Sequence, residues 1–395
     1  MHPRTPPHAP HPPRDLAPHI APNWYASVMG TGIVATAAVT LPIHLPGLRA
    51  AATAVWALAA ALLVAITAVA AVHGRRRARP HADHPVMAHF WGAPPMALMT
   101  VGAGTLTLGA DWIGERAALA AATVLWCAGT ALGLLVAVWI PLRAMTRQAA
   151  EPDAPDAVFG GRLMPVVPPM VSAATGAALV PHAPEGQIRL TLLLGCYALV
   201  GVSLLAALLV IAQIWDRLTR YGPGPAAMVP TLWIVLGPLG QSVTAVNALG
   251  NAARDVLPRP YAAGAEAFGL LYGLPVWGFA MLWLALAAAV TARTAGATRG
   301  GLPFSLTWWS FTFPLGTCVT GTSALAARTG ATALEAVAVV LYAGLVCAWA
   351  TVATRTVRAA ARGTLFPAPP PPVRAGGRVR ADGPLGPVAP ATARN

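Results

Sequence analysis

The sequence predicts an all-α integral membrane protein with ten transmembrane helices, and two observations support this fold class. Ten apolar stretches occupy most of the 395 residues, and each approaches the roughly 20 residues that a helix needs to cross a bilayer. Only 10% of the residues are charged, whereas a soluble domain carries about 25%. The predicted spans are Trp24–Leu41, Arg49–Val72, Val86–Leu108, Ala117–Ile140, Met164–Val180, Leu190–Trp215, Met228–Leu249, Ala265–Ala292, Leu306–Ala326 and Ala331–Ala353.

Both ends of the chain lack apolar runs. Residues 1–21 are rich in proline and histidine, so we expect a disordered tail with no cleavable signal peptide, and the first helix would direct membrane insertion. Residues 355–395 are basic and include the run Pro369–Pro372. They cannot bury enough apolar surface to fold. Residues 22–354 are therefore expected to form one ten-helix transmembrane domain.

The basic residues are distributed unevenly between the two sides of the predicted membrane domain. All 26 are arginine, and 20 of them lie in the two tails and the even-numbered loops. The positive-inside rule then places both termini in the cytoplasm of a cell-membrane protein. The net charge of +13 is explained by this orientation and by attraction to anionic lipid, so we expect the bilayer as a partner and no nucleic acid. The other side holds Arg49, Arg116, Arg189, Arg254, Arg259 and Arg328.

The odd-numbered and even-numbered helices differ in composition. Eight of the nine prolines within spans lie in odd helices, and serine plus threonine divide 19 to 9 in the same direction. Proline kinks a helix, and the freed carbonyls must be satisfied inside the bundle or along a wet cavity. We therefore expect five hairpins around a central pore, with odd helices inner and even helices outer. Helix packing alone is the alternative, and Pro275 in the eighth helix departs from the pattern.

Titratable and metal-ligating residues are few within the spans. Glu266 and Glu335 lie near the ends of even helices, where a carboxylate serves either proton coupling or an interfacial contact. His89 begins the third helix and can titrate near neutral pH, or it is simply interfacial. His81 and His84 have no additional ligand nearby, so no metal or cofactor is expected. The cysteines are apolar packing residues: Cys127, Cys196, Cys318 and Cys347.

Four motifs carry a resemblance to a known family. Pro22–Ile33 resembles the first helix of the tellurite-resistance/dicarboxylate transporter family, and Trp308–Pro314 is similar to the ninth helix of its plant relatives, the slow-type guard-cell anion channels. Gly161–Pro165 and Leu232–Pro238 are supporting matches, in the same order along the chain. The resemblance implies ten helices with five around a pore, a homotrimer, and activities that include anion conductance, malate transport, sulfite efflux and tellurite resistance.

The resemblance also implies a gate. Family members have a phenylalanine on the ninth helix that blocks the pore, and the Thr-Phe-Pro motif matches it to Phe313. Phe311 is the alternative if the match slips by two positions, and it would point to a different helix face. A bulky ring among hydroxyls closes a channel by steric block and dewetting. A buried aromatic that only packs is the competing interpretation.

Hydroxyl, amide and backbone groups are expected to line the pore, because no odd span contains Asp, Glu or Arg and an ionised side chain at mid-membrane is costly. Gln241 and Asn247 can donate to an anion or serve only as links between helices. The residues predicted to line the pore are Gly30, Thr31, Gly32, Pro94, Pro95, Pro168, Pro169, Gly237, Pro238, Gln241, Asn247, Ser310, Thr312, Pro314, Thr317 and Thr320.

Three function classes follow from these observations. The first is a channel-like pathway for small anions, which include chloride, nitrate, sulfite, tellurite and C4-dicarboxylates such as malate. A proton-coupled dicarboxylate carrier needs a titratable pore residue, and an integral membrane enzyme needs a cluster of His, Asp, Glu or Cys at the membrane face. No carboxylate or arginine lies in the odd helices and no such cluster appears in the sequence, so the channel-like pathway is favoured.

Overall fold

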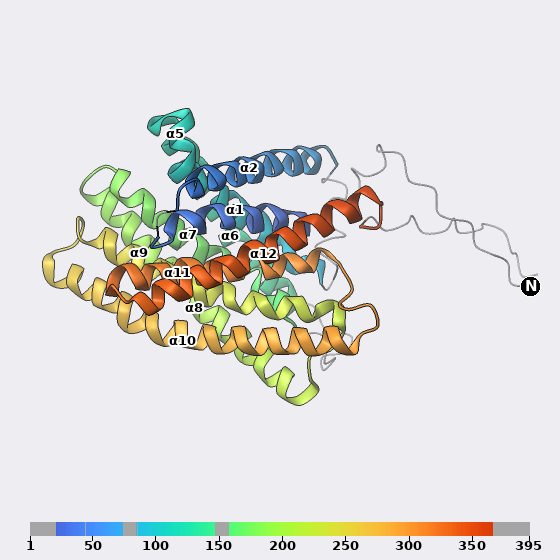
Figure 1. The fold of residues 1–395 in the computed structure, drawn as a ribbon. Helices are drawn as coiled ribbons and strands as arrows, with labels where there is room; N and C mark the ends of the chain where they lie inside the picture. Colours follow the sequence, from blue (N-terminus) through green and yellow to red (C-terminus); the bar gives the residue numbers. More distant parts are fainter. Residues whose placement is uncertain (1–20, 44, 74–83, 85, 147–157, 366–395) are drawn as a thin grey trace, which may run out of the picture.

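The computed structural model describes residues 21–43, 45–73, 84, 86–146 and 158–365. Its described elements are helices that lie side by side with most of their axes roughly aligned (Figure 1). Seven of the described helices are long and apolar enough to cross a membrane. The all-α class is therefore confirmed. Some features of the sequence lie outside the described residues: the predicted N-terminal tail to residue 20, Arg75–Arg79, His81, Arg147 and residues 366–395.

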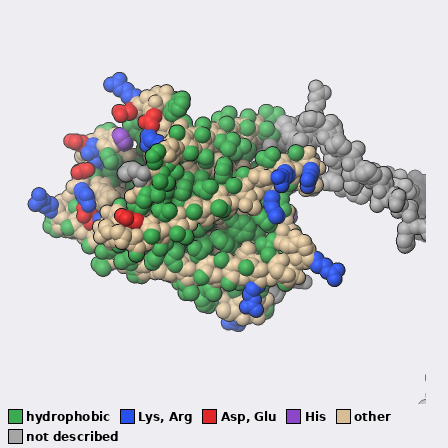
Figure 2. Space-filling model, viewed as in Figure 1, with side chains coloured by type: hydrophobic (Ala, Val, Ile, Leu, Met, Phe, Trp, Pro, Cys, Tyr) green, Lys and Arg blue, Asp and Glu red, His purple; other side chains and the backbone are tan. Residues whose placement is uncertain are grey.

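The outer helices are long, apolar and exposed. In the most apolar window of each, only 17% to 28% of the residues are buried, and side chains such as Leu209 and Val340 are each 70% exposed. Figure 2 shows a hydrophobic band between two ends that carry the charged side chains. These helices therefore have the surface that lipid requires. They are α2 (Leu48–His73), α6 (Glu115–Thr146), α8 (Gln187–Tyr221), α10 (Arg259–Ala297) and α12 (Thr332–Ala361).

The helices between them are buried and form a closed ring. The window that contains α9 is 78% buried and the one that contains α4 is 56% buried. Along the ring α1 contacts α4, α4 contacts α7, α7 contacts α9, α9 contacts α11, and α11 contacts α1. Each ring helix also contacts the outer helix that follows it in the chain. The ring helices are α1 (Tyr25–Thr40), α4 (Ala93–Gly104), α7 (Pro168–Gly176), α9 (Leu236–Ala253) and α11 (Phe313–Thr329).

The prolines of these segments mostly begin α-helices, whereas the sequence suggested kinks inside them. Proline occupies the first turn of α4, α7 and α11, where its missing N–H removes no intrahelical hydrogen bond. A 3₁₀ segment precedes each ring helix. As a result α1, α7 and α11 have only 16, 9 and 17 residues. The 3₁₀ segments are η3 (Pro22–Trp24), η5 (Met87–Gly92), η8 (Gly160–Leu163), η10 (Ala226–Val235) and η11 (Leu306–Phe311).

Two ring helices are prolonged by irregular turns. A π-helical segment, η6 (Thr105–Gly109), and the short α5 (Ala110–Ile113) follow α4, and the 3₁₀ segment η9 (Ala177–His182) follows α7. These segments extend α4 and α7 at their C-terminal ends. The 3₁₀ segments η8 and η10 pack closely, since a Cβ on Gly160 would overlap the carbonyl oxygen of Thr231.

Tryptophan side chains join outer helices to ring helices. Trp277 of α10 donates to the Thr322 hydroxyl of α11 at 2.9 Å, and Trp349 of α12 donates to Thr31 of α1 at 3.1 Å. Trp126 of α6 donates to the carbonyl oxygen of Ser172 in α7 at 2.9 Å. Without water in the hydrocarbon core, each indole N–H needs a partner within the protein. These bonds fix α6, α10 and α12 against ring helices.

Candidate functional site

A cavity of about 160 Å³ lies inside the ring. All of the ring helices, with the turns that prolong α4 and α7, contribute to its wall, and no ionisable side chain is among the described residues that line it. Seven of the lining residues are threonines. The wall consists of Ile33, Thr36, Val39, Thr40, Thr100, Ala103, Thr107, Val171, Ala174, Thr175, Ala178, Gln241, Thr244, Phe313 and Thr320.

Phe313 and Phe311 occupy different environments. Phe313 is the first residue of α11, is 2% exposed and lines the cavity. Phe311 packs edge-on against Trp233 and Trp308, with ring centroids 5.1 and 5.6 Å apart. Of the two phenylalanines, Phe313 is the one whose ring contributes to the cavity wall.

The cavity threonines direct their hydroxyl protons to acceptors within the protein, most of them in their own helices. Thr100 donates to the carbonyl oxygen of Met96 at 2.7 Å, and Thr175 donates to that of Val171 at 2.8 Å. Thr36, Thr40 and Thr107 make the same kind of bond, three or four residues back. Thr244 and Thr320 lie within reach of such carbonyl oxygens and also share a hydrogen bond of 2.8 Å between their hydroxyls, in which either one donates. A hydroxyl bonded in this way presents its lone pairs and its methyl group to the cavity. The threonine wall is therefore polar but offers few free donors.

The two predicted amides differ in their hydrogen bonding. Gln241 lines the cavity and is 5% exposed, and its Oε1 has no hydrogen-bond partner among the described residues. Asn247 donates through Nδ2 to the carbonyl oxygens of Val243 and Gly269, both at 3.0 Å. An unpaired buried polar group costs about 1–3 kcal/mol. Gln241 Oε1 therefore needs a hydrogen-bond donor such as water, whereas Asn247 Nδ2 already has its acceptors within the protein.

Several other predicted pore residues lie in helix contacts. A Cβ on Gly30 would meet the Thr312 hydroxyl and the ring of Trp309, and one on Gly32 would meet the methyl of Thr100. Thr31 accepts from Trp349. The buried members that are not in the cavity wall are Pro94, Pro95, Pro168, Pro169, Pro238, Ser310, Thr312, Pro314 and Thr317.

The ring helix α9 presents one continuous polar face to the ring interior. Gln241 and Thr244 line the threonine cavity, and Asn251 lines the next one, so the spacing is that of one helix face. Gly237 lies one turn before Gln241, is buried, and would place a Cβ within 4 Å of no other atom. The unfilled space thus continues past the level of Gln241. Sequence reasoning missed Thr36, Thr40, Thr100, Thr107, Thr175 and Thr244, which the three- and four-residue spacing of hydroxyls could have indicated.

A wider cavity of about 720 Å³ adjoins the first and shares Thr40, Thr244 and Thr320 with it. Its wall includes Arg254 and Glu266, which form an ion pair. The hydrogen bond and the charge of Glu266 hold the pKa of the Arg254 guanidinium above its ordinary value. The threonine-lined cavity inside the ring therefore adjoins, at one end, this wider cavity, which we call the charged vestibule.

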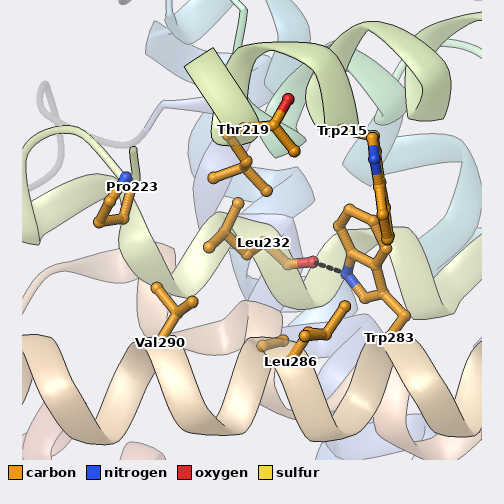
Figure 3. A pocket seen from close by; sticks show the side chains of 9 residues that line it. Trp215, Thr219, Pro223, Leu232, Trp283, Leu286 and Val290 are labelled. Atoms are coloured by element: carbon orange, nitrogen blue, oxygen red, sulfur yellow. Dashed lines mark hydrogen bonds between the residues drawn. The ribbon is translucent and has the colours of Figure 1, made fainter. Parts of the chain in front are cut away.

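Two further hollows lie outside the ring. Figure 3 shows one of about 220 Å³ between α8, η10 and α10, where Trp283 donates to the carbonyl oxygen of Leu232 at 2.9 Å. Its wall carries no charged residue, so it does not suit an anion. The other hollow, of about 390 Å³, contains Arg162 and His89, and the His89 ring lies edge-on to Phe159. His89 is thus remote from the cavity wall.

The comparison with known proteins identifies the family. A profile of the voltage-dependent anion channel family (SLAC1) matches residues 19–357. The chain belongs to this family. The resemblance to tellurite-resistance/dicarboxylate transporters and plant slow-type anion channels is thereby confirmed, and the protein is a multi-pass membrane protein of a transporter and channel family, not of an enzyme family.

Relatives of the SLAC1 family protein come from fungi and archaea. The sulfite efflux pump of Trichophyton rubrum is 27% identical over 356 residues, which cover 87% of this chain and 92% of the pump. That of Arthroderma otae is 29% identical over 315 residues, 76% of this chain and 80% of the pump. An uncharacterised transporter of Methanocaldococcus jannaschii is 26% identical over 309 residues, 77% of this chain and 83% of the relative.

Proposed function

We propose that the chain conducts small oxyanions, sulfite first among them, across the cell membrane through the interior of the ring. In this proposal all ten predicted helices span the bilayer as five hairpins, with α1, α4, α7, α9 and α11 inside. The observation that carries the proposal is the threonine cavity, because every ring helix contributes to its wall. Non-helical turns at membrane depth are tolerated where they line such a cavity.

Phe313 closes this pathway in the proposal. Its ring is nearly inaccessible, with Gln241 and Thr320 in the wall of the same cavity. An apolar ring at a narrow point excludes water as well as ions. Movement of one side chain at the start of α11 would then join the cavity to the space beside Gly237.

Gln241 is the proposed contact for the passing anion. Its side-chain amide carries two donors, whereas the Thr100 and Thr175 hydroxyls donate to helix carbonyls and the Thr244 and Thr320 hydroxyls bond to each other. A single amide donor group gives weak binding without a fixed charge. Conduction requires binding that is weak enough for the anion to leave.

The substrate class rests on the relatives. Those from Trichophyton rubrum and Arthroderma otae are named as sulfite efflux pumps, and sulfite is a small oxyanion whose oxygens accept hydrogen bonds. Malate, tellurite, chloride and nitrate are the alternatives from the same family resemblance.

Flux measurements in proteoliposomes test the proposal. Purified protein should move sulfite faster than malate, with empty liposomes as the control. No titratable side chain is among the described residues of the cavity wall, so a pH gradient should leave the flux of nitrate, which does not change its protonation state, unaltered. Flux of malate alone, or nitrate flux driven by the pH gradient, would favour the proton-coupled carrier.

We also propose that both termini lie in the cytoplasm, which places the charged vestibule on the outer face. The side that contains Arg254 and Arg328 holds six of the 26 arginines, and the positive-inside rule assigns the poorer side to the exterior. A C-terminal alkaline phosphatase fusion should be inactive and a C-terminal green fluorescent protein fusion should fluoresce. The opposite pair of results would reverse the orientation.

A homotrimer with one pore in each subunit is proposed from the family resemblance. The exposed apolar faces of the outer helices, with residues such as Val64 at 69% exposure, can pack against a second copy as well as against lipid. Native mass spectrometry in nanodiscs should give three times the mass of the 40.4 kDa chain. A stable monomer or dimer at the same protein concentration would contradict the trimer.

A further inference from the structure

The charged vestibule has features that the pathway itself does not require. It is the larger of the two connected cavities, at about 720 Å³. It is formed where α9 and α11 end and α10 begins, and its wall includes Arg254, Glu266 and Arg328. Any solute that crosses the ring at this end passes these side chains.

Arg328 is held in place by two asparagines of α9. Its Nε donates to Asn247 Oδ1 at 2.7 Å, and its Nη2 donates to the Asn247 carbonyl oxygen at 3.1 Å and to Asn251 Oδ1 at 2.7 Å. Asn247 is itself fixed by its bonds to the backbone of α9 and α10. The Arg328 side chain is only 13% exposed. The guanidinium is thus oriented before any ligand arrives.

One carboxylate is shared by the two guanidinium groups. Glu266 pairs through Oε1 with Arg254 Nε, and its Oε2 lies 3.8 Å from Arg328 Nη1. That nitrogen makes no hydrogen bond within the described part of the chain. With two positive groups and one negative group in the wall, the cluster keeps one positive charge. Glu266 thus lies against both guanidinium groups.

An unpaired hydroxyl completes the wall. Ser323 is 2% exposed and lines the vestibule, and its Oγ has no hydrogen-bond partner among the described residues. A buried hydroxyl without a partner is costly, so this group also calls for a solvent molecule or a ligand. It lies on α11, five residues before Arg328.

We propose that Arg254, Arg328 and Ser323 form a binding site for a small oxyanion, which Glu266 occupies as an internal competitor until the anion displaces it. The site rests on the proposed function, since it would receive the anion that leaves the ring. A planar guanidinium binds an oxyanion through two parallel hydrogen bonds. Competition by Glu266 keeps the affinity low, so that the anion is released.

Equilibrium binding on purified protein tests this site separately from transport. Isothermal titration calorimetry in nanodiscs, at fixed ionic strength, measures the dissociation constant of sodium sulfite. Glu266→Gln should bind sulfite about fivefold more tightly, the effect expected when a partly exposed ion pair no longer competes. The double variant Arg254→Gln/Glu266→Gln should lose that gain.

Glu335→Gln is the matched control. It removes the same charge at the start of α12, at the same end of the molecule but outside the vestibule wall, so sulfite affinity should not change. Unchanged affinity in Glu266→Gln, or an equal gain in Glu335→Gln, would overturn the site. Because no flux is measured, failure of the transport proposal would appear only in the liposome experiment, whatever the binding result.

Discussion

Replacing Phe313 by alanine is expected to raise sulfite flux at least about tenfold in proteoliposomes, which corresponds to lowering the barrier by about 1.4 kcal/mol. The Phe313 ring is 2% exposed, and Phe313 and Gln241 line the same threonine cavity, which the ring is proposed to close. Truncation leaves a methyl group there and connects the cavity to the unfilled space at Gly237. Stopped-flow or electrode measurement of sulfite efflux at matched protein density checks this expectation.

Phe311→Ala is the matched control for the gate. Its ring packs between Trp233 and Trp308, away from the cavity, so flux should stay at the level of the unmodified protein. The two variants also separate gating from packing, because truncation of a core phenylalanine costs roughly 3–5 kcal/mol and opens no path. If Phe313→Ala lowers the yield of folded protein and leaves flux unchanged, Phe313 is a core residue.

Replacing Gln241 by leucine should reduce sulfite flux about tenfold when both proteins carry Phe313→Ala. A hydrogen bond to a charged group contributes about 1.5–3 kcal/mol, and leucine cannot donate one. Because Gln241 Oε1 has no hydrogen-bond partner within the described protein, leucine should also leave the melting temperature unchanged or raise it. Flux assays and thermal unfolding in the same detergent measure both effects.

Thr100→Val controls for polarity and volume at the same cavity. The Thr100 hydroxyl already donates to the carbonyl oxygen of Met96, so its loss should change flux less than twofold, an effect of roughly 0.4 kcal/mol. Equal losses in Thr100→Val and Gln241→Leu would mean that general polarity, and not the Gln241 amide, supports the anion.

The sequence was sufficient for the fold class and for the division between proline-rich and plain helices. Lipid permits only long apolar segments with internally satisfied backbones, so hydropathy alone locates α2, α6, α8, α10 and α12. The predicted role of the prolines was wrong. Pro94, Pro168 and Pro314 do not kink helices but lie in the first turns of α-helices that follow 3₁₀ or turn segments. Such starts depend on the backbone of neighbouring segments, which composition does not record.

The details of the site required the structure. Gln241 and Asn247 look alike in the sequence, but Asn247 is paired by Arg328, 81 residues away, and by Gly269 of another helix. Thr31, Thr36 and Thr40 all lie on α1, but Thr36 and Thr40 line the cavity whereas Thr31 accepts from Trp349, 318 residues away. In both cases the hydrogen-bond partner is distant in the chain, so the sequence alone does not indicate which side chain is paired.

Chemical block at a single position tests most directly whether anions cross inside the ring. In Phe313→Ala protein with the exposed Cys127 and Cys347 replaced by serine, Thr244→Cys places a thiol in the cavity wall. Modification with a charged methanethiosulfonate should abolish sulfite flux, while the same reagent on Gly201→Cys, in open surroundings on α8, should leave flux intact. Undiminished flux through protein whose Thr244→Cys thiol is fully labelled by mass spectrometry would contradict a pathway through the ring.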